Sequence, residues 1–250
     1  MTFKAIVFDL NGTLVDINTD EGNEQIYRAV SHFLTYQGIR ASRWEVRDEY
    51  YRIMDEQRRA SGEEFPEFDA VNLWRDYLNR RPEALAALPP EKVRWMPLFL
   101  AEMYRGISRN RLELYPGVKN VLDELAPRYR LAALSDAQSA WAVPEMLAAG
   151  LDGYFQPVIV SGDLGYRKPD PRIFQMALDA LNLPPQEVLF VGNDMYRDVF
   201  GAHRMGMKTV FFASNQGRKK FSGAEPDYII YDFWQLRQAI DFLEAQSSTA

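Results

Sequence analysis

Six short runs of aliphatic and β-branched residues constrain the fold of this chain more than any other feature. Each run is followed by a polar or glycine-containing turn, and segments with a helical spacing of apolar residues lie between most of them. The runs occupy residues 5–8, 131–134, 158–160, 188–191, 209–212 and 228–230. Continuous apolar strands separated by helices are what a parallel sheet covered on both faces requires. We therefore predict a doubly wound α/β domain.

The stretch of residues 17–113 interrupts this alternation. It contains no strand-like run, but apolar residues recur at helical spacing in segments such as 71–78 and 93–103. We predict that this stretch forms an inserted, all-helical domain. The α/β domain would then be built from residues 1–16 and 114–250.

Composition excludes several kinds of site and partner. The 250 residues include no cysteine and only two histidines, which excludes thiolate nucleophiles and cysteine-ligated zinc and leaves hard metals on oxygen ligands. The net charge of -6 argues against a nucleic acid as the main partner. No basic and then apolar leader precedes the first run, and no apolar stretch reaches the roughly 20 residues of a membrane span. We expect a cytoplasmic protein with no membrane partner.

The first candidate site follows the first run. The aliphatic residues end on Asp9, and Asn11 and Gly12 permit a sharp turn directly after it. A carboxylate in that position can attack phosphorus and form an aspartyl phosphate, which splits one difficult hydrolysis into two easier steps. Taken alone, the same pattern is as typical of an ordinary turn in which Asp9 caps a backbone group.

Two further segments supply candidate phosphate ligands. Ser135 ends the second run, and its hydroxyl could donate a hydrogen bond to a transferring phosphoryl group, although serine is also common in turns. Lys168 precedes Asp170 and Pro171, which we predict to be the N-cap and the first residue of a helix. An ammonium group there can neutralise a nucleophile and a phosphate, whereas a lone lysine is usually a solvated surface residue.

The fourth run, residues 188–191, is followed by a cluster of oxygen-bearing side chains, Asn193, Asp194 and Asp198. Because the carboxyl ends of parallel strands form the ligand crevice of an open sheet, this cluster should lie beside Asp9. Carboxylates packed together there would repel one another unless a cation lay between them, and magnesium is the natural candidate. The competing interpretation is a helix N-terminus, where an acid such as Asp198 is favoured by the helix dipole.

The order and spacing of these four motifs resemble the haloacid dehalogenase-like (HAD) superfamily of hydrolases over nearly the whole chain. The all-helical insert after the first motif is similar to the family's type C1 cap. The Pro-Gly-Val of residues 116–118 and the Pro-Asp-Tyr of residues 226–228 are similar to phosphoglycolate-phosphatase-like members. The resemblance implies a Rossmann-like three-layer core with a parallel sheet, a mobile helical lid, a Mg²⁺ cofactor and a phosphoaspartate formed on Asp9. The implied substrate is a small phosphorylated metabolite.

On this basis the site residues take three roles. The catalytic residues are Asp9, Asn11 and Lys168, the substrate-binding residues are Thr13, Ser135 and Lys168, and the metal ligands are Asp9, Asn11, Asn193 and Asp194. By resemblance, the residue at the Asn11 position binds the metal through its backbone carbonyl, which does not depend on the side chain.

Two positions depart from the family's pattern. Phosphatases of the family usually carry a second aspartate two residues after the nucleophile, acting as general acid and then general base, and here that residue is Asn11. An amide cannot exchange a proton near neutral pH, and positioned acid–base catalysis is worth about 10² to 10⁴-fold in rate. We therefore expect slow turnover, with Asp16 and Asp20 as nearby candidates for the missing proton transfer. In the fourth motif Asn193 replaces the usual first aspartate.

The residue after Asn193 is Asp194 rather than the usual serine, and we prefer Asp194 as the charged metal ligand. With Asp9 and Asp198 it would give the site enough negative charge to hold a divalent ion once water completes the shell.

These departures keep three functions open. The prediction is a HAD-like phosphatase, that is, a phosphoric monoester hydrolase. The first alternative is a non-catalytic or near-inactive phosphate-binding protein of the same fold. The second is a 2-haloacid dehalogenase, because those enzymes also lack the second aspartate, need no metal and use their aspartate to attack carbon. They are expected to carry an aromatic residue at the Asn11 position and to lack the acidic cluster, which argues against this alternative.

Overall fold

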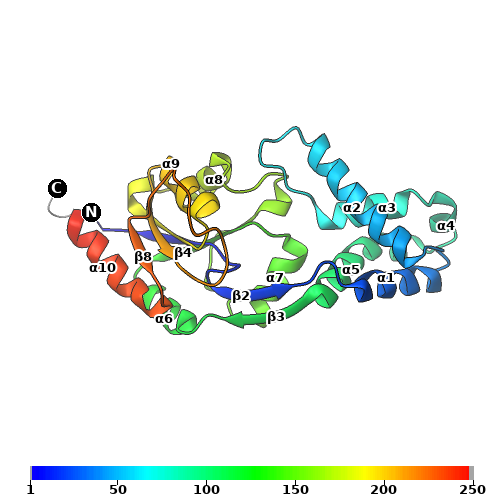
Figure 1. Cartoon of the computed structure of the whole chain (residues 1–250), viewed down its shortest axis with the longest axis horizontal. Coiled ribbons are helices and arrows are strands. Elements are labelled where there is room, and N and C mark those ends of the chain that lie inside the picture. The colour runs from blue at the N-terminus through cyan, green and yellow to red at the C-terminus, as the bar shows by residue number, and fades with distance from the viewer. Residues whose placement is uncertain (1, 248–250) are drawn as a thin grey trace.

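The computed structural model describes residues 2–247 and shows two lobes, one built on a sheet and one built from helices (Figure 1). The sheet has six parallel strands in the order β5-β4-β1-β6-β7-β8. The strands are β1 (Ala5–Phe8), β4 (Arg130–Ser135), β5 (Val158–Val160), β6 (Val188–Gly192), β7 (Lys208–Phe212) and β8 (Tyr228–Ile230). All six predicted strands are confirmed, and so is the α/β class.

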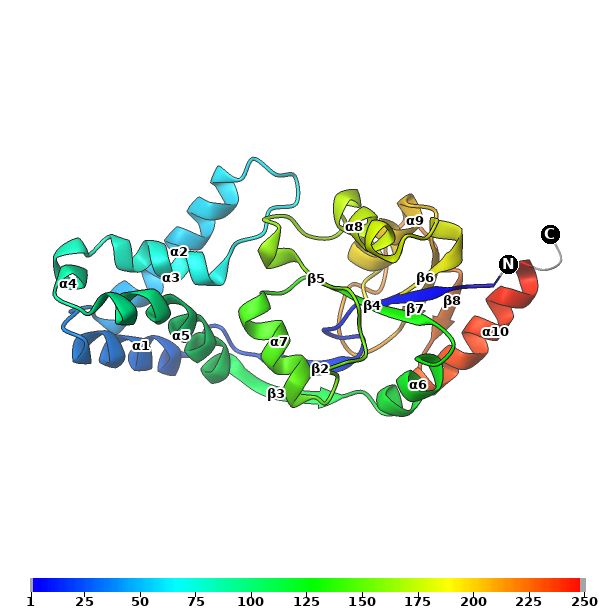
Figure 2. The ribbon, with the colours of Figure 1, turned by 180° about the vertical axis from the view of Figure 1, so that it is seen from behind.

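Helices cover both faces of this sheet and make the sheet lobe a three-layer structure (Figure 2). The α-helices are α6 (Val118–Leu125), α7 (Ser139–Ala148), α8 (Pro171–Leu181), α9 (Gly201–Arg204) and α10 (Leu236–Ser247). Short turns of 3₁₀-helix are η1 (Ser161–Asp163), η2 (Pro185–Glu187) and η4 (Phe233–Gln235), and η3 (Met195–Phe200) is a π-helical turn.

The central strand β1 shows why its run is apolar without a break. Ile6 and Phe8 pack in one hydrophobic cluster with residues of α6 and α10, whereas Ala5 and Val7 pack in another with residues of α8 and α9. Successive side chains of a strand point to opposite faces of a sheet, so a strand covered on both faces must be apolar at every position.

The helical lobe consists of α1 (Glu24–Tyr36), α2 (Arg43–Ala60), α3 (Ala70–Asn79), α4 (Pro82–Ala86) and α5 (Pro90–Ser108). It has a hydrophobic cluster of its own, in which the rings of Tyr50 and Tyr104 stack with centroids 4.4 Å apart and Trp74 is fully buried. Trp141 of α7 joins this cluster from the sheet lobe. The helices agree with the predicted insert, and the exact bounds of two separate domains stay a prediction.

Two strands connect the lobes, and the sequence analysis did not predict them. β2 (Val15–Thr19) and β3 (Arg109–Leu114) pair antiparallel as a separate two-stranded sheet (Figure 1). The expectation that residues 17–113 contain no strand is therefore wrong at both ends of that stretch. Most of the side chains on these strands are polar and partly exposed, so no apolar run marked the strands in the sequence.

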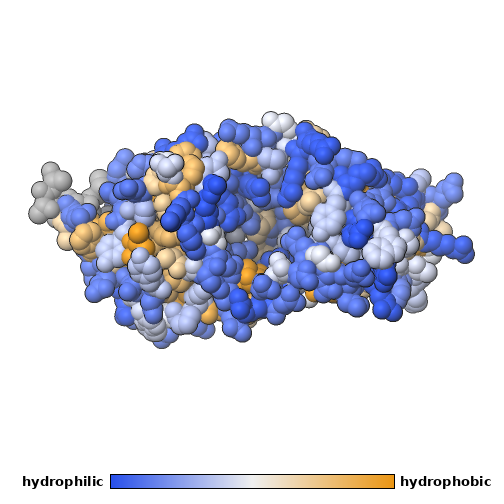
Figure 3. All heavy atoms as spheres, viewed as in Figure 1, coloured by the Kyte–Doolittle hydropathy of each residue, from blue (hydrophilic) through white to orange (hydrophobic). Residues whose placement is uncertain are grey.

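The face of the molecule drawn in Figure 3 shows no large apolar area. In Figure 3 the side toward the viewer is mainly hydrophilic, and hydrophobic residues appear there as small patches. Within residues 2–247, no helix is both long enough and apolar enough to cross a membrane.

Candidate active site

The sheet aligns the ends of three neighbouring strands. Phe8 of β1 is level with Ala133 of β4 and with Val191 of β6, and the backbone N–H of Asp9 donates to the carbonyl of Val191 at 2.9 Å. The residues that follow these positions therefore meet at the carboxyl edge of the sheet, where the ligand crevice of a parallel sheet lies. Asp9 lies there on the central strand.

Lys168 is the buried cation of this edge. Its Nζ lies 2.7 Å from Asp9 Oδ1 and 2.7 Å from Asp198 Oδ1, and it donates to the carbonyl of Leu134 at 3.2 Å. Burial alone would lower the pKa of Lys168, but the carboxylates of Asp198, Asp9 and Asp136 outweigh this effect and raise it overall. The ammonium group therefore stays charged beside the candidate nucleophile.

The helix after Lys168 begins as predicted. Asp170 is the N-cap of α8, its side chain accepts from the N–H of Arg172, and Pro171 is the first helical residue. The same helix start therefore fixes the turn that carries Lys168.

In the turn after β1, the hydroxyl of Thr13 lies between two side-chain oxygens. The Thr13 hydroxyl lies 2.9 Å from Asp9 Oδ2 and 3.3 Å from Asn193 Oδ1. Gly12 has a positive φ of 86°, and a Cβ at this position would lie 2.2 Å from Nδ2 of Asn193. The turn therefore packs directly on Asn193, and only glycine fits this turn.

Ser135 ends β4 beside this group with an unused hydroxyl. Its side chain is fully buried, and its Oγ has no hydrogen-bond partner within the described part of the chain. A buried hydroxyl without a partner is costly unless a ligand supplies one, so Ser135 is suited to bind an oxygen of a phosphoryl group.

Asp194 has a different environment from the one that the sequence suggested. Its Oδ1 accepts the backbone N–H groups of Tyr196 and Arg197, and its Oδ2 accepts the N–H of Arg218 and lies 3.1 Å from Arg197 Nε. It is thus the N-cap of η3. Burial opposes ionisation, but these donors prevail and hold the pKa of Asp194 below its ordinary value. We preferred Asp194 as the charged metal ligand, but both of its carboxylate oxygens already accept hydrogen bonds.

Asp198 is similarly committed. Its Oδ2 accepts the N–H groups of Asn193 and Asp194 at 3.0 and 2.9 Å, while Oδ1 binds Lys168. Burial raises the pKa of Asp198, and Lys168 opposes that rise. The role of Asp198 in this geometry is to orient the lysine and the loop after β6.

The side-chain oxygens of Asp9 and Asn193 remain for a magnesium ion whose coordination shell also includes a bound phosphate. In the range 2–247 no three Asp, Glu, His or Cys side chains form a metal-binding group. Asp9 Oδ2 and Asn193 Oδ1 nevertheless converge on the single hydroxyl hydrogen of Thr13, so one of the two is left without it. Mg²⁺ usually takes one or two carboxylates together with waters and substrate phosphate, which agrees with such a sparse set of protein ligands.

A cavity of about 260 Å³ adjoins Asn11 where the two lobes meet. Three arginines and three carboxylates line it, namely Arg58, Arg105, Arg167, Glu21, Glu67 and Asp136. A larger cavity of about 1000 Å³ lies beside Arg130 and Leu131, at the opposite end of β4 from Ser135, and contains none of the site residues. The smaller cavity is therefore the candidate substrate pocket.

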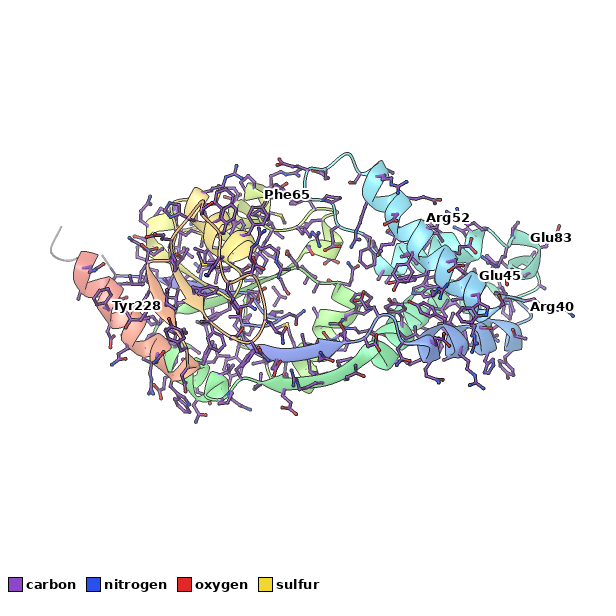
Figure 4. All side chains as sticks on the ribbon, viewed as in Figure 1. Arg40, Glu45, Arg52, Phe65, Glu83 and Tyr228 are labelled. Carbon is purple, nitrogen blue, oxygen red and sulfur yellow. The ribbon has the colours of Figure 1, made fainter. Side chains whose placement is uncertain are left out.

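The segment between α2 and α3 closes this cavity against the sheet lobe. Phe65 lies beside the sheet lobe in Figure 4, and its carbonyl accepts the N–H of Arg167 at 3.0 Å. The N–H of Glu67 donates to the carbonyl of Gly165 at 2.9 Å, and the side chain of Gln138 donates to the carbonyl of Phe68 at 2.7 Å. The helical lobe thus supplies one wall of the pocket through backbone contacts.

The sequence analysis missed Asp136 and Arg197. The Asp136 side chain is 6% exposed, and Arg197 Nη1 lies 3.5 Å from its Oδ2. An acid directly after the strand-ending Ser135 was a visible signal, whereas nothing in the spacing of Arg197 pointed to the site. Asp16 and Asp20, the other candidates for proton transfer, do not line the pocket. Asp16 accepts hydrogen bonds from neighbouring side chains. Asp20 is exposed and accepts the N–H of Gly22.

The sequence of the chain is similar to those of known hydrolases. A sequence model of haloacid dehalogenase-like hydrolases matches residues 3–206. A glyceraldehyde 3-phosphate phosphatase of Pyrococcus abyssi is 32% identical over 210 residues, which are 84% of this chain and 81% of that protein. A phosphoserine phosphatase of Thermus thermophilus is 35% identical over 176 residues, which are 68% of each.

Solved structures share the fold at lower identity. A 2-haloacid dehalogenase from Pseudomonas syringae pv. Tomato has a TM-score of 0.70 at 20% identity, covering 97% of this chain and 100% of that chain. A HAD phosphatase from Thermococcus onnurineus has a TM-score of 0.56 at 23% identity, covering 95% of this chain and 98% of that chain. At these identities the similarity establishes the fold alone.

Proposed function

Because the chain belongs to the haloacid dehalogenase-like hydrolases, we propose that it is a magnesium-dependent phosphatase that uses Asp9 to remove phosphate from a small phosphorylated metabolite. The relatives from Pyrococcus abyssi and Thermus thermophilus, 32% and 35% identical, are phosphatases, which supports phosphatase activity on a small phosphorylated substrate. The observation that carries the proposal is the contact of Asp9 with a buried, charged Lys168, beside the unpaired hydroxyl of Ser135.

In the first step the Asp9 carboxylate attacks phosphorus, and the bond between phosphorus and the leaving oxygen breaks. Lys168 orients the carboxylate through Oδ1, and its charge also offsets the negative charge that develops on the phosphoryl oxygens. Ser135 donates its free O–H to one of those oxygens, which satisfies a group that is otherwise unpaired. Thr13 fixes the other oxygen of Asp9.

In the second step water attacks the aspartyl phosphate and releases inorganic phosphate and the Asp9 carboxylate. Both steps need a proton to move, first to the leaving group and then from the water. The Asn11 amide cannot carry it, so we expect turnover to be slower by about 10² to 10⁴-fold than with a carboxyl group at this position.

The magnesium ion would be held by Asp9, the backbone carbonyl of Asn11 and the side chain of Asn193, and it would offset the charge of the substrate phosphate. Asn193 is a neutral ligand, and the carboxylate of Asp194 is occupied by its own turn. The ligand set therefore contributes a single carboxylate, and water and the phosphate complete the shell.

Hydrolysis of para-nitrophenyl phosphate, with and without magnesium, tests the proposal. We expect magnesium-dependent release of nitrophenol that is abolished in Asp9→Asn and accelerated in Asn11→Asp. Asp20→Asn is a matched control, because this exposed carboxylate lies outside the pocket and its loss should leave the rate unchanged.

Two other outcomes would replace the proposal. Release of halide from a 2-haloacid without magnesium, abolished in Asp9→Asn, would establish a dehalogenase. Binding of phosphate by the parent, without hydrolysis by any variant, would establish a binding protein.

A further inference from the structure

The pocket beside Asn11 contains three carboxyl groups, and a phosphatase without the usual second aspartate needs one of them to move a proton. Glu21 is exposed. Glu67 is buried, but its Oε1 accepts the N–H of Phe68 and its Oε2 accepts the hydroxyl of Ser161. Both of its oxygens are therefore in use in the contact between the lobes.

Asp136 differs from both. Its side chain is 6% exposed, and its Oδ1 accepts the backbone N–H of Lys168 at 3.0 Å. Its Oδ2 is buried and accepts no hydrogen bond from a described residue, and it lies 3.5 Å from Arg197 Nη1 as an ion pair. It directly follows Ser135 at the end of β4, and it lines the same pocket as Asn11. When Asp136 is protonated, the O–H on this oxygen needs an acceptor, and an oxygen of a substrate in this pocket would supply one.

We propose that Asp136 carries the proton between the leaving group and water, in place of the amide of Asn11. This inference rests on the proposed phosphatase function and goes beyond it, because it assigns a proton-transfer residue that the motifs do not contain.

The charges around Asp136 permit this role. Burial raises the pKa of Asp136, while Lys168 before α8 and Arg197 of η3 oppose the rise. Asp198 of η3 adds to the rise, and Glu67 of the helical lobe is another carboxyl group close enough to interact with Asp136. The acid form therefore persists to higher pH than in an exposed aspartate, and the two cations keep the carboxylate form accessible.

The chemistry balances over the two steps. As Asp9 bonds to phosphorus, the protonated carboxyl of Asp136 gives its hydrogen to the leaving oxygen, and the alcohol departs with the electrons of the broken P–O bond. In the second step the Asp136 carboxylate takes a proton from the attacking water, the Asp9–phosphorus bond breaks, and phosphate leaves. Asp9 ends as a carboxylate and Asp136 as an acid, so both are restored.

The test compares substrates whose leaving groups differ in basicity. An alkoxide is a strong base and leaves only with a proton, whereas para-nitrophenolate is a weak base and leaves without one. In Asp136→Asn we expect kcat/KM for O-phosphoserine or glyceraldehyde 3-phosphate to fall by about 10²-fold or more, and kcat/KM for para-nitrophenyl phosphate by much less. The parent should lose alkyl-phosphate activity as the pH rises through the pKa of Asp136, and the variant should lack this pH dependence.

A second readout needs only the aryl substrate. Without a base for the second step, the aspartyl phosphate accumulates, so Asp136→Asn should release a burst of about one nitrophenol per active site before a slow phase. The amide of this variant keeps an oxygen that can accept the N–H of Lys168, so the fold should persist, and thermal melting checks this. Asn11→Asp placed in Asp136→Asn should restore alkyl-phosphate hydrolysis.

Glu67→Gln is the matched control, since it changes the other buried carboxyl of the pocket. Equal losses on both substrates in Asp136→Asn, with no burst and an unchanged pH profile, would overturn the proposal. So would transfer of these effects to Glu67→Gln. A parent with no phosphatase activity would instead refute the proposed function, so the two failures are distinguishable.

Discussion

Replacing Lys168 by methionine should destabilise the protein strongly, because the lysine separates two buried carboxylates. The side chains of Lys168, Asp9 and Asp198 are 1%, 7% and 2% exposed, and both ion pairs measure 2.7 Å. Removing one partner of a buried ion pair costs about 3–5 kcal/mol, since it leaves an uncompensated charge. The free energy of unfolding of a domain is about 5–15 kcal/mol, so this loss is a large fraction of it.

The loss should depend on pH in a defined direction. Burial raises the folded-state pKa of Asp198, and without the opposing lysine it lies further above that of the unfolded chain, so the folded variant binds more protons. Its stability then falls as the pH rises through this pKa, by up to about 1.4 kcal/mol per pH unit. The difference in stability between parent and variant should therefore be largest above the folded-state pKa of Asp198 and shrink as the pH falls below it.

Urea unfolding followed by circular dichroism measures this difference. Lys208→Met is the matched control, because Lys208 pairs with Asp227 at 2.6 Å but its side chain is 47% exposed. An exposed pair is worth about 0.2–1 kcal/mol. Adding Asp198→Asn to Lys168→Met should recover part of the loss by removing one of the two repelling charges. Equal losses for Lys168→Met and Lys208→Met, or a loss that does not change with pH, would refute this reasoning.

Two more predictions concern the fourth motif. Asp194→Ala should lower the free energy of unfolding by about 1–2 kcal/mol through loss of the N-cap of η3, while Asp194→Asn should keep the cap. Thermal melting and magnesium titration of both variants test this. A fall in magnesium affinity without a change in melting temperature would instead make Asp194 a ligand. Asn193→Asp should tighten magnesium binding by about tenfold, or about 1.4 kcal/mol, because it adds a second carboxylate. Calorimetric titration with magnesium measures this, and unchanged affinity would exclude Asn193 from the shell.

The strands of the large sheet could be predicted because burial on both faces leaves an unbroken apolar run. Asp9, Ser135 and Lys168 could be placed together for a related reason, since the carboxyl ends of parallel strands share one edge. β2 and β3 could not be predicted in the same way. They lie partly exposed between the lobes, so packing does not require an apolar pattern in them.

The role of Asp194 shows a different limit. Spacing along the chain locates a carboxylate near the crevice, but it does not tell whether the side chain faces a ligand or its own backbone. Here the N–H groups of Tyr196 and Arg197 lie within reach and take one oxygen. The role of Asp136 was equally ambiguous, because its oxygen without a hydrogen bond matters only once the segment from α2 to α3 encloses the pocket.

The β2–β3 ribbon also determines how the two lobes can move apart. The chain passes from the sheet lobe to the helical lobe along β2 and returns along β3, so both covalent connections run side by side in one antiparallel ladder. A force that separates the lobes pulls both strands along their length. The hydrogen bonds between the strands are perpendicular to this direction, so they carry little of the force. Neither connection can slide past the other without breaking the ladder. The two connections therefore act as one ribbon that resists stretching and shear, rather than as two independent tethers.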